Sequence, residues 1–221
     1  MNDNQQSFAV RREMMVDTQV RPSDVTKFPI IDAMLTIPRE RFVPDSLREA
    51  AYLGDHLPLG DGRVLLDART FGKMLDALDI QDSDLVLDLG CGLGYSSAVL
   101  GRMAEAVVAI EDEADWVSDA QSMLSEVGID NVAVIEGALA MGASQHGPFD
   151  AIILQGAVDE IPPQLIDQLK EDGRIIAIFR VGNAGAARLG TKSGGRVSWR
   201  WEFDATAPLL NGFEKTQAFT F

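Results

Sequence analysis

The stretch "VLDLGCGLGYSS", residues 86–97, decides the fold that this sequence predicts. A short apolar run carries one acid, Asp88, and is followed by three glycines at alternate positions, Gly90, Gly92 and Gly94. A buried strand that ends in glycines and leads into a helix is typical of the first strand–turn–helix unit of a doubly wound α/β sheet. Glycines at such a turn let a ligand approach the backbone closely. We therefore expect a ligand site at this turn.

From residue 84 onward, the chain alternates between expected strands and expected helices. The strands are mostly apolar, and such strands separated by helices imply a parallel sheet covered on both faces. Beyond this region, "AARLG", a turn at "TKSGG" and then "RVSWRWEF" predict a β-hairpin, and "QAFTF" is a candidate last strand. The expected strands are 85–89, 106–111, 132–137, 149–156 and 174–182, and the expected helices between them are 96–104, 114–128 and 162–173.

The first third of the chain reads differently, as helices and loops. Apolar spacing predicts helices over 8–20, 29–37 and 68–80, while 54–63 is rich in Gly, Asp and Pro and is expected to be a loop. In the 68–80 helix, one face collects Phe71, Met74, Leu75 and Leu78.

These patterns predict one domain, residues 1–221, with three parts. Residues 1–75 are expected to form a helical region, residues 76–185 the α/β core that carries the ligand turn, and residues 186–221 the hairpin and last strand. The expected fold class is α/β, with a doubly wound, mostly parallel, Rossmann-like sheet.

The composition excludes several classes of partner and site. The formal net charge of −15 opposes binding to phosphate backbones, so we expect no nucleic-acid partner. No apolar run approaches the ~18–20 residues that span a bilayer, and the N-terminus lacks a signal-peptide core, so we expect no membrane partner and a cytoplasmic location. A single cysteine, Cys91, excludes an internal disulfide and an all-cysteine metal site, and we expect no metal.

The residues at the turn also indicate what the ligand is. Glu111 ends the second expected strand, where an acid can hold both hydroxyls of a ribose, so the ligand is expected to be an adenosine derivative. A dinucleotide site favours Gly-x-Gly-x-x-Gly, but here the third glycine comes one residue early and Tyr95 takes its place. Asp88 is a poor neighbour for a pyrophosphate and a good one for an ammonium or a sulfonium. S-adenosylmethionine carries both cations, so these residues favour it over NAD.

Longer stretches resemble a known family. The segment "VLDLGCGLGYSSAVL" resembles the first motif of class I S-adenosylmethionine-dependent methyltransferases. Residues 33–62, "AMLTIPRERFVPDSLREAAYLGDHLPLGDG", and the later segment "GPFDAIILQGAVDEIPPQLIDQLKEDGRIIAIF" are similar to the protein-L-isoaspartate O-methyltransferase family. The resemblance covers about residues 10–185 and implies S-adenosyl-L-methionine as cofactor, S-adenosyl-L-homocysteine as product and a protein or peptide as substrate. It also implies that the helical region 1–75 is a substrate cap and that 76–185 is the cofactor-binding core.

The resemblance also implies a set of cofactor-binding residues. Asp88 matches the acid that contacts the methionine part, Glu111 matches the ribose acid, and Asp112 lies beside it near the adenine. Ala138 replaces the aspartate that normally contacts adenine. The full expected cofactor set is Asp88, Gly90, Cys91, Gly92, Gly94, Tyr95, Ser96, Glu111, Asp112, Gly137, Ala138, Leu139 and Gln155.

The expected acceptor site departs from the family pattern. Where the family carries a threonine-isoleucine-serine-glutamine-proline run, this chain reads Val64 to Ala68, so that Leu66 stands at the serine position. Leu66 offers no hydrogen-bond donor to an acceptor carboxylate, and Asp67 brings a like charge close to it. This change predicts weak isoaspartyl methylation, and the sequence shows no catalytic residue. The expected substrate-binding residues are His56, Leu57, Pro58, Leu66 and Asp67, the last two lining the methyl-transfer site.

Three functions stay open at this point. The first is methyl transfer to a protein or peptide carboxylate, with isoaspartyl repair as the family's task. The second is methyl transfer to a different acceptor, small or non-anionic, and the third is a non-catalytic cofactor-binding protein. The sequence alone does not define the oligomeric state.

Overall fold

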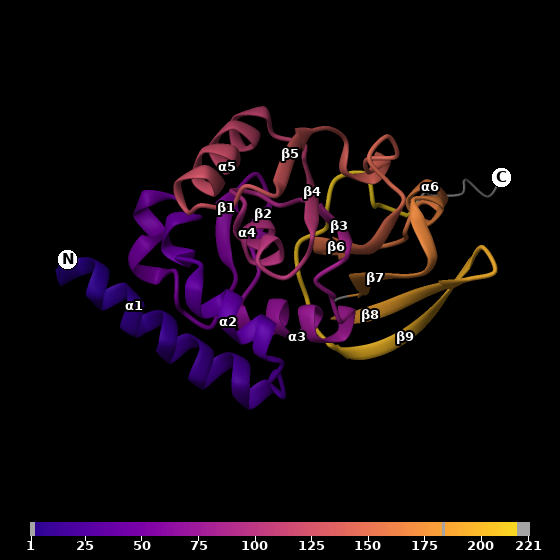
Figure 1. Cartoon of the computed structure of the whole chain (residues 1–221). Helices are drawn as coiled ribbons and strands as arrows, with labels where there is room; N and C mark the ends of the chain where they lie inside the picture. Colours follow the sequence, from indigo (N-terminus) through magenta and orange to yellow (C-terminus); the bar gives the residue numbers. More distant parts are fainter. Residues whose placement is uncertain (1–2, 183, 216–221) are drawn as a thin grey trace.

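The computed structural model describes residues 3–182 and 184–215, and its centre is a seven-stranded sheet (Figure 1). The strand order is β5-β4-β3-β6-β7-β8-β9. Neighbours from β5 to β7 pair in parallel, and β8 and β9 add an antiparallel edge. The predicted doubly wound, mostly parallel sheet with a C-terminal hairpin is confirmed. The strands are β3 (Leu85–Leu89), β4 (Ala106–Glu111), β5 (Val132–Glu136), β6 (Phe149–Val158), β7 (Leu169–Val181), β8 (Ala184–Ser193) and β9 (Arg196–Asp204).

The helices cover this sheet, and those nearest the N-terminus pack outside the others (Figure 1). The predicted apolar face of α3 (Ala68–Leu78) is buried as expected. A single apolar cluster joins Met34 of α2 and Phe71 of α3 to Ile153 on the sheet, so the N-terminal helices share a core with the sheet. The other helices are α1 (Asp3–Met15), continued by a π-helical turn (Val16–Val20), α2 (Phe28–Thr36), α4 (Tyr95–Gly101), α5 (Ala114–Glu126) and α6 (Pro163–Asp167), with 3-10 turns at Arg21–Ser23, Arg39–Arg41, Asp45–Ala50 and Leu139–Met141.

The loop expected over 54–63 was a wrong prediction, because most of it forms a β-hairpin. Strands β1 (Leu57–Gly60) and β2 (Arg63–Leu65) pair antiparallel. Between them Asp61 and Gly62 adopt φ values of 48° and 75°. Two left-handed residues of the type Asp-Gly make the two-residue turn that matches the twist of a hairpin. Glycine and aspartate therefore mark a hairpin turn here rather than an open loop.

The helix expected over 162–173 was also too long. Helix α6 spans only Pro163–Asp167, and the chain re-enters the sheet at Leu169, which pairs with Phe149. Asp172 adopts a left-handed φ of 62°, which a helix does not accommodate. The candidate strand "QAFTF" lies outside the described residues.

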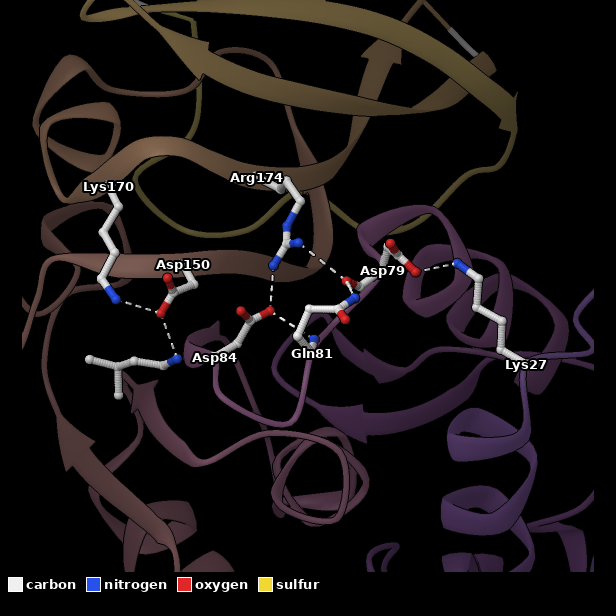
Figure 2. Close-up of polar contacts among 8 residues, drawn as sticks. Lys27, Asp79, Gln81, Asp84, Asp150, Lys170 and Arg174 are labelled. Carbon is white, nitrogen blue, oxygen red and sulfur yellow. Dashed lines mark hydrogen bonds and ion pairs between the residues drawn. The ribbon is translucent and has the colours of Figure 1, made fainter.

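A polar network holds together the amino ends of β3, β6 and β7, opposite the turn at residues 90–94 (Figure 2). Arg174 pairs with Asp84, which also accepts a hydrogen bond from the Gln81 N–H at 2.9 Å. Asp150 accepts one from the Leu85 N–H at 2.8 Å.

The same network extends to both sides of these strands (Figure 2). Lys170 donates to Asp150 at 2.7 Å. At the other end, Lys27 pairs with Asp79 at the end of α3, also at 2.7 Å, and this contact ties the N-terminal helices to the same edge.

Asp150 should stabilise the protein only above acidic pH. Burial raises the pKa of Asp150, but hydrogen bonds from Lys170 and the Leu85 N–H outweigh it and hold the pKa below its usual value. An acid with a depressed folded-state pKa contributes stability above its unfolded pKa and loses it as the pH falls through the folded pKa. We expect Asp150→Asn to lower the free energy of unfolding by about 1 kcal/mol at pH 7. Urea unfolding at pH 7, 5 and 3 should show the difference shrinking below about pH 4.

The matched control for this prediction is Asp82→Asn, at an exposed aspartate in the turn before β3. It should change the unfolding free energy little at any of the three pH values. A loss at Asp150 that is equal at all three pH values would show that packing, rather than the carboxylate charge, is responsible.

Candidate functional site

The turn after β3 has a backbone that requires its glycines. Gly90, Gly92 and Gly94 adopt φ values of 79°, 57° and 95°. Residues with a Cβ rarely adopt this left-handed region, so the alternate glycines are needed for the shape of the turn. The turn lies at the carboxyl ends of β3 and β4, the edge at which doubly wound sheets bind ligands.

Asp88 is a fully buried acid directly before this turn. Its Oδ2 accepts hydrogen bonds from the Ser96 and Ser97 hydroxyls, each at 2.6 Å, and its Oδ1 accepts one from the Gln155 amide at 2.7 Å. Burial raises the pKa of Asp88, against the lowering effect of these three donors. The sequence predicted Asp88, Ser96 and Gln155 for one site, and the structure brings them into direct contact.

Glu111, at the end of β4, is also fully buried, and its carboxylate is surrounded by donors. Oε2 accepts from the Gly92 N–H at 2.6 Å, and Oε1 accepts from the Asp112 N–H at 3.0 Å. Arg63 donates to both oxygens, from Nη1 to Oε1 at 2.9 Å and from Nη2 to Oε2 at 3.0 Å. Burial raises the pKa of Glu111, while the bonds from Arg63 lower it.

Arg63 is the residue of this site that sequence reasoning missed. It begins β2, its side chain is 5% exposed, and it forms a second ion pair with Asp112 at 2.9 Å. Its guanidinium carbon lies 5.7 Å from the centre of the Trp116 ring. No local sequence pattern indicates this role, because Arg63 and Glu111 are 48 positions apart in the chain.

The segment after β9 crosses the same edge of the sheet. The Pro208 carbonyl accepts from the Ala157 N–H at 2.8 Å, and the Leu210 N–H donates to the Ala157 carbonyl at 2.9 Å. The Leu210 side chain is buried against the Gly90 turn, and Asn211 donates to Asp112 at 3.1 Å. The C-terminal segment therefore covers the carboxyl ends of β3, β4 and β6.

The remaining expected cofactor residues take different positions. The Tyr95 ring packs in the core, with its centre 5.9 Å from that of Phe42. Cys91 is buried, and burial with the nearby Asp88 and Glu111 charges raises the pKa of its thiol, so the thiol stays protonated. The Gly137 N–H donates to the Glu111 carbonyl at 3.0 Å, after which Ala138 is exposed and Leu139 is buried. Their contacts with a cofactor stay predictions.

A cavity of about 570 Å³ lies beside the start of the hairpin. His56 and Asp67, both expected to bind substrate, line it together with Arg69, and its far wall comes from β8 and the end of β9. The Arg69 side chain is exposed. The lining residues are His56, Asp67, Arg69, Thr70, Ala184, Gly185, Asp204, Ala205 and Thr206.

Asp67 and His56 are tied to each other and to the walls of this cavity. Asp67 begins α3 as its N-cap, where its Oδ1 accepts from the Thr70 N–H at 2.8 Å. The Asp67 N–H donates to Nδ1 of His56 at 2.9 Å, so Nδ1 is the unprotonated nitrogen and Nε2 donates to the Thr206 carbonyl at 2.7 Å. A structural role for both residues is therefore established, and their contact with a substrate stays a prediction.

The other expected acceptor residues do not line this cavity. Leu66 is 1% exposed and belongs to the core, and its carbonyl accepts from Arg39 at 2.7 Å. Leu57 is buried as well, and Pro58 is exposed.

Among the described residues, 3–182 and 184–215, no group of three or more His, Cys, Asp or Glu side chains is arranged to hold a metal ion. No helix within this part of the chain is both long and apolar enough to cross a membrane.

Comparison with known proteins identifies the family. The family profile described as "Protein-L-isoaspartate(D-aspartate) O-methyltransferase (PCMT)" matches residues 11–200. A protein-L-isoaspartate O-methyltransferase of Syntrophus aciditrophicus is 38% identical over 169 residues, which are 76% of this chain and 78% of that protein. One from Methylorubrum extorquens is 34% identical over 213 residues, 92% of this chain and 90% of that protein.

Solved structures agree with this assignment. A protein-L-isoaspartate O-methyltransferase superimposes with a TM-score of 0.80 at 25% identity, covering 91% of this chain and 66% of that one. A putative one from Plasmodium falciparum, solved in complex with S-adenosyl-L-homocysteine, shares the fold with a TM-score of 0.76 at 18% identity, covering 90% and 98% of the two chains. This chain belongs to the protein-L-isoaspartate O-methyltransferase family of S-adenosylmethionine-dependent methyltransferases.

Proposed function

We propose that this chain transfers a methyl group from S-adenosylmethionine to a carboxylate of a protein or peptide, with an isoaspartyl residue as the acceptor. One observation carries the proposal furthest. Asp88 and Glu111 lie on either side of the glycine turn, each with its carboxylate oriented by several donors. Such a pair of acids suits a ligand that has an ammonium at one end and a ribose at the other.

The residues of the turn have the chemistry that the cofactor requires, but other side chains of this protein cover them. Asp88 and Glu111 are both 0% exposed. The space next to Gly90, which lacks a Cβ, is taken by Arg63 and Leu210, and the space next to Gly92 is taken by Leu59. The cofactor therefore reaches its two acids only after the side chains that cover them have moved.

The chemical demands on the chain are modest. S-adenosylmethionine, when bound, supplies a methyl group already activated by its sulfonium. The protein then has to hold the acceptor in line and exclude water, which is catalysis by proximity and orientation. Consistent with this, Cys91 keeps its proton and offers no competing nucleophile beside the turn.

The cavity next to the hairpin supplies the acceptor site in this proposal. Arg69 presents a cation at its edge, and a guanidinium can hold a carboxylate through two parallel hydrogen bonds. The negative charge of Asp67 lies at the N-terminus of α3, where the helix dipole stabilises it. This reduces the repulsion between Asp67 and an acceptor carboxylate that the sequence predicted. We assign Arg69 the role that the serine hydroxyl plays in the family pattern.

A second acceptor class is favoured by one feature of the same cavity. Asp67 and Asp204 place two carboxylates on its walls against the single guanidinium of Arg69. This balance of charge would suit an acceptor that is neutral or cationic. Such an acceptor would fit the alternative of a methyltransferase for a small or non-anionic substrate.

A methyl-transfer assay separates these functions. Labelled S-adenosylmethionine is incubated with an isoaspartyl peptide, with the same peptide carrying a normal aspartate, and with an amine-bearing peptide. We expect label on the isoaspartyl peptide alone. Label on the amine peptide instead would favour the second acceptor class. Cofactor binding without label on any peptide would make the chain a non-catalytic binding protein.

The cytoplasmic location that we expect is inferred from the sequence.

A further inference from the structure

Arg63 stands where the proposed cofactor would place its ribose. We propose that the Arg63 guanidinium occupies this ribose site when no cofactor is bound and thereby lowers the chain's affinity for the cofactor. The β1–β2 hairpin, which carries Arg63, must move the guanidinium away from Glu111 before an adenosyl group can bind. This inference rests on the proposed function, since it concerns access to the same site.

The first argument is the number of acceptor positions that Glu111 has left. A carboxylate offers about four lone-pair positions, two on each oxygen. Arg63 Nη1 and the Asp112 N–H approach Oε1, and Arg63 Nη2 and the Gly92 N–H approach Oε2. All four positions are used in this structure. A ribose hydroxyl can therefore donate to Glu111 only where Arg63 has left.

The second argument is the space that the side chain fills. A Cβ placed on Gly90 would lie 2.7 Å from Nη2 of Arg63, and one placed on Gly92 would lie 2.7 Å from Cδ1 of Leu59. Leu59 and Arg63 flank the Asp61–Gly62 turn from opposite strands. The surface that glycines leave free for a ligand is thus covered by both arms of one hairpin.

The third argument is that this hairpin is built to move more easily than the sheet. Its strands have four and three residues, with an irregularity between Pro58 and Gly60. A two-stranded hairpin of this kind is marginally stable by itself. At its tip, the space around Gly62 is open, with no atom within 4 Å of a Cβ placed there. In addition, the buried Nε of Arg63 has no hydrogen-bond partner, so the guanidinium is incompletely satisfied where it lies.

The expected effect follows from the fraction of molecules in which the site is open. When only a fraction of a protein is competent to bind, its apparent dissociation constant is the intrinsic constant divided by that fraction. If the hairpin is withdrawn in about one molecule in ten or fewer, removing Arg63 tightens binding by roughly 10-fold or more.

The test is calorimetric titration of the full chain with S-adenosyl-L-homocysteine. Arg63→Gln should bind it roughly 10-fold more tightly than the wild type, or better. The matched control is Arg200→Gln, an exposed arginine on the far edge strand β9, which should bind as the wild type does. If Arg63→Gln binds equally or more weakly, Arg63 is not a competitor of the cofactor and the inference is wrong.

A second substitution keeps the inference testable if Arg63→Gln folds poorly. Arg63→Lys keeps a positive charge opposite Glu111 but cannot form the two parallel hydrogen bonds. We expect its affinity to lie between those of the wild type and Arg63→Gln. An affinity equal to that of the wild type would contradict the paired geometry as the cause.

The rate of cofactor binding gives a second test, which does not depend on how stably the variants fold. Trp116 lies next to Arg63, so its fluorescence should report the withdrawal of the guanidinium. On mixing with S-adenosyl-L-homocysteine, the wild-type rate should level off at high ligand, where hairpin opening limits it, and the Arg63→Gln rate should keep rising. A wild-type rate that never levels off contradicts a closed site. If neither the wild type nor the variants bind S-adenosyl-L-homocysteine, both the proposed function and this inference are wrong. If the wild type and Arg63→Gln bind it equally well, only this inference is wrong.

Discussion

Replacing Glu111 with glutamine is expected to lower the free energy of unfolding by about 3 kcal/mol, the largest stability change that we predict for this chain. The substitution leaves the Arg63 guanidinium buried with only Asp112 as an anionic partner. Breaking a buried ion pair from one side typically costs about 3–5 kcal/mol, because the remaining charge stays desolvated. The residual pair with Asp112 places the expected value at the lower end. Urea unfolding of the unliganded chain measures it.

Two further variants make this measurement specific. Glu136 ends the neighbouring strand β5, is paired in register with Glu111 and is exposed, so Glu136→Gln should change stability by less than about 0.5 kcal/mol. The double variant Arg63→Gln with Glu111→Gln removes both buried charges and should recover most of the loss. If the two single losses simply add in the double variant, Arg63 and Glu111 are not coupled in solution and the closed site is not the populated one.

Replacing Arg69 with alanine is expected to reduce kcat/KM for an isoaspartyl peptide by roughly 10- to 100-fold. A hydrogen bond to a charged group is worth about 1.5–3 kcal/mol, which corresponds to that range. The loss should appear on the acceptor side only, because Arg69 lines the cavity beside the hairpin and not the turn at Gly90. Steady-state assays at varied peptide concentration measure the effect on the acceptor, and titration with S-adenosyl-L-homocysteine measures the effect on cofactor affinity.

The control for Arg69 is Arg48→Ala, an exposed arginine in the turn Asp45–Ala50. It should leave both the peptide kinetics and the cofactor affinity unchanged. An unchanged rate in Arg69→Ala would mean that backbone groups or another residue hold the acceptor carboxylate. The wild-type rate in the same assay also tests whether Leu66 and Asp67 make isoaspartyl methylation weak, as the sequence predicts.

The sequence determined the parts of this protein that depend on local pattern. The apolar run before Gly90, the glycine spacing and the alternating strands and helices were enough to predict the doubly wound sheet, and family resemblance placed Asp88, Ser96 and Gln155 in one site. These features can be read locally because strand and helix periodicities span only a few residues. The face of α3 that carries Phe71, Met74 and Leu75 was predicted for the same reason.

Only the tertiary structure decided how the site is closed. Arg63 meets Glu111 across 48 positions of the chain, and no local pattern reports that contact. The hairpin over 57–65 was missed because a Gly- and Asp-rich stretch reads as a loop until its two short strands are seen to pair. Arg69, to which we assign the acceptor carboxylate, was not expected from the sequence because a lone arginine on a helix usually faces solvent. Periodicity reports which residues are buried, whereas the pairing of charges from distant segments depends on how the hairpin is laid over the sheet, and that arrangement decides what the cofactor must displace.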